Sequence, residues 1–244
     1  MKFGIIGYGS FGKLLTDVLS SYGQVVVFGR SDIDDLPKDN IKIVDELKDL
    51  SDCNVIILAV GLDSLDDTSK KLADIVGPNT LVADVCSVKV KPIEILTKNL
   101  GKKCKLLFTH PLFGPQTVEN GVITGNKIVI CSGEDFKGRT EIMNFFKYQL
   151  KLDVIKMSAE DHDREMAWVH ALTFFVGRGL MEINPPKSHL STGYYQKLLD
   201  LVELEASHSI ELFNTVQRGN PFAEEIRKKL LDKLGKIDQE IGGN

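Results

Sequence analysis

Six residues near the start of the chain constrain its fold more than any other segment. Gly7, Tyr8, Gly9, Ser10, Phe11 and Gly12 form a G-x-G-x-x-G motif between the apolar run Lys2–Ile6 and an amphipathic helical pattern. The first glycine permits a tight turn, the second lets backbone amides approach a pyrophosphate, and the third allows close packing of helix on strand. We therefore expect these six residues to bind a dinucleotide at a helix N-terminus. The alternative is a glycine-rich turn in some other α/β protein.

Short β-rich runs alternate with helical patterns through the first part of the chain. Strands separated by helices predict an α/β fold, a Rossmann-type doubly wound parallel sheet with helices on both faces. Val60 directly follows the third predicted strand, Asn54–Ala59, and we predict that it contacts the cofactor. The predicted strands are Lys2–Ile6, Gln24–Phe28, Asn54–Ala59, Thr80–Asp84, Lys105–Phe108, Lys127–Cys131 and a last one at Leu152–Ile155.

The character of the sequence changes after Met157. Helical patterns cover 158–182, 194–217 and the segment from 221 towards the C-terminus, and Asn-Pro pairs separate them. We therefore divide the chain into a nucleotide-binding Rossmann domain, 1–157, and a smaller all-helical domain for substrate binding and dimerisation, 158–244. Three amphipathic helices make a thin core by themselves, so we expect a homodimer through this domain.

The overall composition excludes several classes of partner. A net charge of -4 argues against nucleic-acid binding and provides no basic surface for membranes. No apolar run approaches the roughly 18–20 residues of a membrane helix, and the chain starts directly in a strand without a signal peptide. The four cysteines form no C-x-x-C pair. We expect buried free thiols in a cytoplasmic protein, and no metal site.

The end of the second predicted strand discriminates between nicotinamide cofactors. NAD enzymes usually carry an acid about 20 residues past the glycine motif, where it holds the ribose 2′-hydroxyl. Gly29 occupies that position here, followed by Arg30 and Ser31. An arginine can pair with a 2′-phosphate and a serine can donate to it, which favours NADP. The alternative is that Arg30 is a solvated loop residue and that Asp32 or Asp34 takes the acid's role.

Residues suited to catalysis follow the fourth and fifth predicted strands. Ser87 and Lys89 come shortly after Asp84, and His110 lies between Thr109 and a proline- and glycine-rich turn. A histidine at the carboxyl end of a parallel strand is well placed as a general base, and Ser87 can reach the same substrate hydroxyl. Lys89 either balances a carboxylate or orders the loop. The alternatives are a structural role for His110 and a helix-capping role for Asp84.

Seven segments, in order along most of the chain, resemble the prephenate/arogenate dehydrogenases of tyrosine biosynthesis, and most of all the plant-type arogenate enzymes. The most specific pair is Ser87-Val88-Lys89 and Thr109-His110-Pro111-Leu112-Phe113-Gly114-Pro115. The others are Gly7–Gly12, Gly29–Asp32, Glu160–Arg164, Val176–Arg178 and Tyr195 with Leu198–Glu203.

This resemblance implies an NADP-dependent dehydrogenase whose substrate is a cyclohexadienol with a ring carboxylate. The carbon that bears the 4-hydroxyl gives hydride to NADP, while His110 accepts the hydroxyl proton and Ser87 holds the oxygen. The ring then loses carbon dioxide and becomes aromatic, so the reaction is effectively irreversible.

Two pocket positions depart from the family pattern. Family members generally carry a second histidine on the first helix of the helical domain, where this chain has Phe174. His170 lies one turn earlier on the same face and either substitutes for it or is a plain core-edge histidine. Many bacterial members clamp a carboxylate with an arginine where this chain has Gln196. The candidates for that carboxylate are Arg178, Lys197 and Lys89, and Arg178 has the alternative of an ion pair with an acid on a neighbouring helix.

Prephenate and arogenate differ in one side-chain group, because arogenate has an ammonium where prephenate has a keto oxygen. In the plant-type pattern, Asn120 falls at a position where an acid favours arogenate. Asn120 is neutral, which tilts the prediction towards prephenate, although Glu119 is adjacent.

Two other functions remain open at this point. One is a different small-substrate NADP dehydrogenase or reductase of the same two-domain plan, such as a β-hydroxyacid or imine enzyme. The other is a non-catalytic NADP-binding regulator, against which the intact pair of Ser87 and His110 argues.

Overall fold

The computed structural model describes residues 1–29, 39–131 and 138–243. Two compact units make up the chain, Met1–Ala159 and Glu160–Asn244. No helix among the described residues is both long and apolar enough to cross a membrane.

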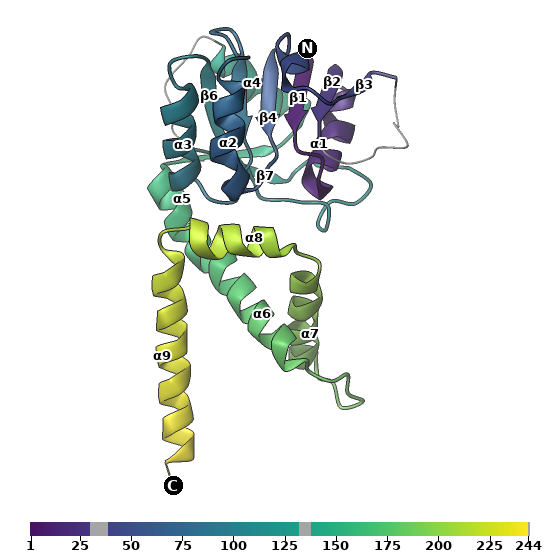
Figure 1. The fold of residues 1–244 in the computed structure, drawn as a ribbon. Coiled ribbons are helices and arrows are strands. Elements are labelled where there is room, and N and C mark those ends of the chain that lie inside the picture. The colour runs from purple at the N-terminus through teal and green to yellow at the C-terminus, as the bar shows by residue number, and fades with distance from the viewer. Residues whose placement is uncertain (30–38, 132–137, 244) are drawn as a thin grey trace. The chain divides into compact units, whose positions relative to one another are not determined.

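The first unit contains an eight-stranded sheet in the order β3-β2-β1-β4-β5-β6-β7-β8 (Figure 1). The first six positions repeat the 3-2-1-4-5-6 order of dinucleotide-binding folds, which confirms the predicted Rossmann-type sheet. Central strands are almost wholly apolar because helices bury both of their faces. The strands are β1 (Lys2–Ile6), β2 (Gln24–Phe28), β3 (Ile41–Val44), β4 (Val55–Leu58), β5 (Leu81–Asp84), β6 (Lys105–Pro111), β7 (Lys127–Cys131) and β8 (Asp153–Met157).

Two features of the sheet differ from the sequence expectation. Strand β3 is an additional edge strand, which pairs in parallel with β2 and is only four residues long. Strand β7 runs antiparallel to β6, although the other pairings are parallel. A parallel partner for β6 needs a crossover connection, usually a helix, and residues 112–126 contain none.

Helices cover both faces of the sheet. On one face, the helices α2 (Leu62–Leu72) and α3 (Val90–Leu100) pack on β1, β4 and β5 together with the short 3₁₀ helix η1 (Leu47–Leu50). On the other face, α1 (Ser10–Ser20) packs on β1 and β2, and α4 (Arg139–Asn144) with the π-helical η2 (Phe145–Gln149) packs on β5 to β7.

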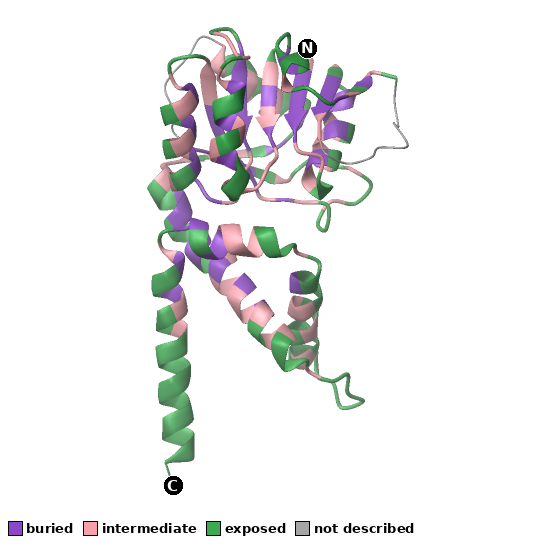
Figure 2. Cartoon of the chain, in the orientation of Figure 1, coloured by how far each residue is buried: buried purple, intermediate pink, exposed green. Residues whose placement is uncertain are grey.

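The second unit is all-helical, as expected. The first predicted helix is continuous from α5 (Ala159–Met166) through the π-helical η3 (Ala167–Leu172) to α6 (Thr173–Ile183), where Asn184 ends it in a left-handed conformation. The second is two helices rather than one, α7 (Gly193–Ala206) and α8 (Ile210–Asn214), the latter continued by η4 (Thr215–Gly219). The side chain of Ser209 accepts a hydrogen bond from the Leu212 amide and starts a new helix. Helix α9 (Ala223–Gly242) is mostly exposed (Figure 2).

Candidate functional site

The glycine motif forms a tight turn between β1 and α1. Gly7 has a φ of 103°, and a Cβ there would lie 2.3 Å from the Ala59 carbonyl oxygen. A Cβ at Gly12 would lie 2.1 Å from the Gly7 oxygen, so the helix packs directly on the turn. These two positions require glycine for steric reasons, in agreement with the roles expected from the motif.

The N-terminus of α1 is open and suited to an anion. A Cβ at Gly9 would meet no atom of the described residues within 4 Å, and both Gly9 and Ser10 are exposed. Among the described residues no side chain caps this helix, and its first turn carries no acid. Unsatisfied amides at a helix N-terminus favour phosphate groups, so the chain's own residues fit the pyrophosphate of a dinucleotide.

Side chains connect this turn to the rest of the sheet edge. The rings of Phe11 and Phe113 have centroids 6.2 Å apart, which brings the glycine turn beside the loop that follows His110. Val60 would contact a side chain at Gly7, at 3.2 Å, and its carbonyl oxygen lies 4.0 Å from the Cys86 thiol. Val60 therefore lies between the glycine turn and the loop that carries Ser87.

Arg30 and Ser31, on which the choice of NADP depends, lie outside the described residues.

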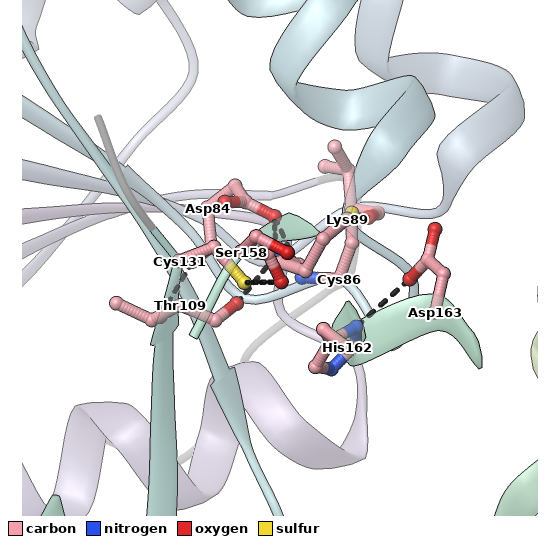
Figure 3. A network of polar contacts seen from close by, with 9 residues as sticks. Asp84, Cys86, Lys89, Thr109, Cys131, Ser158, His162 and Asp163 are labelled. Atoms are coloured by element: carbon pink, nitrogen blue, oxygen red, sulfur yellow. Dashed lines mark hydrogen bonds and ion pairs between the residues drawn. The ribbon is translucent and has the colours of Figure 1, made fainter. Parts of the chain in front are cut away.

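A buried ion pair ties the ends of β5 and β6 together (Figure 3). Lys89 and Asp84 have fully buried side chains, and the Lys89 ammonium donates to Asp84 Oδ2 and to the Thr109 carbonyl oxygen. Asp84 Oδ2 also accepts from the Cys86 amide at 3.1 Å, and Thr109 Oγ1 donates to the Asp84 carbonyl oxygen at 2.6 Å. Of the two roles left open for Lys89, the structure favours ordering the loop.

His110 and Ser87 lie at the edge that this network orders. His110 is the next residue after Thr109, is 3% exposed, and pairs with Val129 of the antiparallel strand β7. Ser87 is half-buried, between Asp84 and Lys89 in the chain. Asp84, the last residue of β5, pairs in register with Phe108. Ser87 therefore follows β5, whereas β6 extends to Pro111 and His110 lies inside it, not after it as the sequence predicted, because the antiparallel partner β7 prolongs the pairing. The structure thus places Ser87 and His110 at the carboxyl edge of the sheet.

No disulfide joins the four cysteines among the described residues, and the pKa values of three of them are raised. Burial, and secondly the Asp84 charge, raise the pKa of Cys86 to about 12. Burial also raises the pKa values of Cys53 and Cys104 to about 11. These thiols stay protonated near neutral pH, so they contribute packing rather than chemistry.

In the helical unit, Glu205 of α7 is a buried acid with two partners. Arg178 of α6 donates to Glu205 Oε1 from Nε at 3.0 Å and from a terminal nitrogen at 2.8 Å. His208 Nδ1 lies 3.4 Å from the other oxygen of the same carboxylate. Glu205 is only 1% exposed, so Arg178 takes the alternative that the sequence left open, an ion pair with an acid on a neighbouring helix.

His170 lies in the same unit, in the π-helical segment η3. Its ring stacks on Phe174 at 5.3 Å, and Phe174 in turn lies 4.4 Å from the His208 ring. Burial lowers the pKa of His170 to about 4, with smaller contributions from His162 and His208. His170 is therefore neutral near pH 7.

The remaining predicted substrate residues are exposed. Lys197 has its ammonium 5.8 Å from the Tyr194 ring, and both line a shallow hollow with Thr192 and Gly193. Asn120 and Gly121 both have positive φ, and the Val122 amide donates to the Glu119 carbonyl oxygen. This turn requires left-handed residues, which gives Asn120 a conformational role of its own.

Sequence reasoning missed Glu205 and His208, and it considered only a capping role for Asp84. A signal for Glu205 is present, because it follows Leu198 by seven residues and Leu201 by four, on the apolar face of its helix. A charge on such a face is seldom buried without a partner.

The motif Glu160–Arg164 also contains a buried pair, in which His162 Nδ1 lies 2.8 Å from Asp163 Oδ1 (Figure 3).

Family models match two parts of the chain. Residues 18–148 match "Prephenate dehydrogenase, nucleotide-binding domain", and residues 180–244 match "TYRAAT1-like, C-terminal domain". Arogenate dehydrogenase 2, chloroplastic, of Arabidopsis thaliana is 28% identical over 253 residues, which cover 100% of this chain and 70% of the relative. Arogenate dehydrogenase 1, chloroplastic, of the same plant is 30% identical over 235 residues, but these are 92% of this chain and only 37% of the relative.

Solved structures share the fold. A prephenate dehydrogenase from Aquifex aeolicus has a TM-score of 0.75 and 18% identity, covering 98% of this chain and 91% of that one. Another Aquifex aeolicus prephenate dehydrogenase structure, in complex with hydroxyphenyl propionate and NAD+, has a TM-score of 0.73 and 20% identity, covering 100% and 92%. The arogenate dehydrogenase of Synechocystis has a TM-score of 0.69 and 19% identity, covering 99% and 91%.

Proposed function

This chain belongs to the prephenate dehydrogenase family, and we propose that it oxidises and decarboxylates prephenate or arogenate with NADP as the hydride acceptor. One observation carries the proposal. The open N-terminus of α1 and the edge that holds Ser87 and His110 belong to one sheet, and Phe11 packs against Phe113 between them. This arrangement lets a dinucleotide on the glycine turn reach the residues suited to proton transfer.

The glycine turn and α1 would hold the cofactor's pyrophosphate, with Val60 beside it. When bound, the nicotinamide supplies an acceptor for the substrate's hydride. The choice of NADP over NAD rests on Arg30 and Ser31 in the sequence. The test is Arg30→Ala, which should raise the Michaelis constant for NADP far more than that for NAD. An equal rise in the Michaelis constants of both cofactors would refute the preference for NADP.

His110 is the proposed general base. It accepts the proton of the substrate's 4-hydroxyl as the hydride leaves the same carbon, and the Ser87 hydroxyl positions that oxygen by a hydrogen bond. Asp84, Lys89 and Thr109 hold both residues in place through the buried network. Loss of carbon dioxide then leaves an aromatic ring. Replacing His110 with Asn should lower turnover by roughly 10²–10⁴-fold, the usual contribution of a general base, while sparing NADP binding. A near-normal rate would remove His110 from this role.

Among the three candidates for the substrate carboxylate, Lys197 is the one with an exposed side chain. Lys89 is engaged with Asp84 and Thr109, and Arg178 with Glu205. We therefore propose Lys197 as the carboxylate ligand and His170 as a neutral pocket residue. Replacing Lys197 with Gln should raise the Michaelis constant of the substrate and leave that of NADP unchanged. No change in either constant would contradict the assignment.

The neutral Asn120 favours prephenate over arogenate. The direct test is NADPH fluorescence after mixing the protein with NADP and each compound separately. A faster signal with prephenate supports this preference, and a faster signal with arogenate reverses it. Silence with both would favour another small-substrate dehydrogenase or a non-catalytic regulator.

A further inference from the structure

The glycine turn closes directly on the end of β2. The Gly7 amide donates to the Phe28 carbonyl oxygen at 2.9 Å, and a Cβ at Gly29 would lie 2.9 Å from the Tyr8 Cβ. In dinucleotide folds an acid at this strand end holds the ribose 2′-hydroxyl of NAD. Tyr8 fills the space that the first side-chain carbon of such an acid would need at position 29. The packing of the turn therefore disfavours an acid there.

Lys13 brings a cation to the same tyrosine. Its ammonium lies 5.4 Å from the centroid of the Tyr8 ring, within the range of a cation–π contact. Asp17 follows one turn further along α1, but no ion pair joins it to Lys13 in the described part of the chain. Side chains on a helix lean towards its N-terminus, which explains why Lys13 reaches back to the glycine turn.

The charge at this strand end suits a phosphate better than a hydroxyl. Lys13 is exposed and Tyr8 is half-buried, so the ring holds the ammonium beside the strand end while leaving it open to a ligand. A ribose 2′-hydroxyl is neutral, whereas a 2′-phosphate is an anion that forms strong hydrogen bonds with an ammonium group.

We propose that Lys13 binds the ribose 2′-phosphate of the cofactor, with its ammonium positioned by the Tyr8 ring. Together the two residues select NADP over NAD, since one supplies a cation and the other excludes an acid from position 29. The inference rests on the proposed use of NADP, and it concerns residues other than Arg30 and Ser31.

The first experiment measures cofactor binding without turnover. NADPH and NADH are titrated into the complete chain, and binding is followed by the fluorescence of the reduced nicotinamide. Lys13→Gln should raise the Kd of NADPH about 10-fold or more, the usual effect of losing a hydrogen bond to a charged group, and leave the Kd of NADH unchanged. Lys13→Arg keeps a cation and should retain most of the affinity for NADPH. Circular dichroism verifies the fold of each variant.

Lys147→Gln is the matched control. The Lys147 ammonium lies 5.5 Å from the centroid of the Tyr148 ring, so η2 carries the same kind of contact between an exposed lysine and a tyrosine. This contact is remote from the glycine turn, because η2 packs through Phe145 on Tyr22, just past the C-terminal end of α1. Lys147→Gln changes the net charge equally and should bind both cofactors as the wild-type chain does.

The second experiment identifies which phosphate Lys13 contacts. Adenosine 2′,5′-bisphosphate and adenosine 5′-monophosphate differ only in the 2′-phosphate, and each is used to displace NADPH. Lys13→Gln should weaken binding of the bisphosphate and leave binding of the monophosphate unchanged. An equal loss of affinity for both compounds would assign Lys13 to another phosphate of the cofactor and overturn the proposal.

Two results of the first titration would also overturn the proposal, and they differ in what they leave standing. If the wild-type chain prefers NADPH but Lys13→Gln binds it as tightly as Lys147→Gln does, the role of Lys13 is refuted and the proposed use of NADP stands. If the wild-type chain binds NADH as tightly as NADPH, both the role of Lys13 and the use of NADP are refuted.

Discussion

The buried pair of Lys89 and Asp84 permits a quantitative prediction. Both side chains are fully buried, and the Lys89 ammonium is the only cation that the described residues place on this carboxylate. Replacing Lys89 with Met keeps the volume roughly constant but leaves a carboxylate without its counter-charge. Asp84 Oδ1 already lacks a hydrogen-bond partner among the described residues, so after the substitution only the Cys86 amide would satisfy the group.

Breaking a buried ion pair on one side costs roughly 3–5 kcal/mol. In a unit of this size that corresponds to a fall of roughly 6–20 °C in melting temperature. The assay is thermal and urea unfolding followed by circular dichroism, with Lys89→Met compared with Asp84→Asn/Lys89→Met. The double variant removes the charge and keeps an acceptor for Cys86, so it should recover more than half of the loss.

The matched control is Lys70→Met. Lys70 also pairs with an aspartate, Asp66 at 2.5 Å, but both side chains are exposed. Solvent screens such a pair, so this variant should keep its stability. The reasoning fails if Lys89→Met is as stable as the control, or if the double variant is less stable than Lys89→Met. Because the network positions Thr109 beside His110, turnover of Lys89→Met should also fall below that of the control.

Three further predictions test separate parts of the structure. Gly12→Ala should lower the melting temperature because its methyl group meets a backbone oxygen at 2.1 Å, whereas Gly9→Ala should fold normally and lose affinity for NADP in a titration. Burial lowers the pKa of His170 to about 4, so the unfolded chain binds a proton near pH 6.5 that the folded chain does not. Stability should thus fall between pH 6.5 and 4 by up to about 3 kcal/mol more than in His170→Phe, as urea unfolding at each pH would show. Glu205→Ala should destabilise the helical unit by at least about 1.5 kcal/mol, measured by the fluorescence of Trp168, the chain's single tryptophan, and an unchanged transition would contradict a buried ion pair.

Much of the fold was predictable because its signals are local. A glycine turn between an apolar run and an amphipathic run has few structural solutions, and the strands β1, β2 and β7 have the predicted bounds. The edge strand β3 was missed because four residues with a lysine among them carry little periodicity. The antiparallel direction of β7 depends on the connection from β6 rather than on the strand itself.

In the candidate site, too, some features were predictable from the sequence and others were not. The sequence by itself determined the residue types at the sheet edge, Ser87 and His110, because one follows β5 and the other lies near the carboxyl end of β6. Only the tertiary structure decided how Lys89 and Arg178 are used, since each meets its carboxylate through a contact that periodicity does not encode. Lys89 reaches a strand end 20 residues away, and Arg178 reaches an acid 27 residues away on another helix. Burial makes those charges require partners, and the packing of strands and helices selects which partners they find.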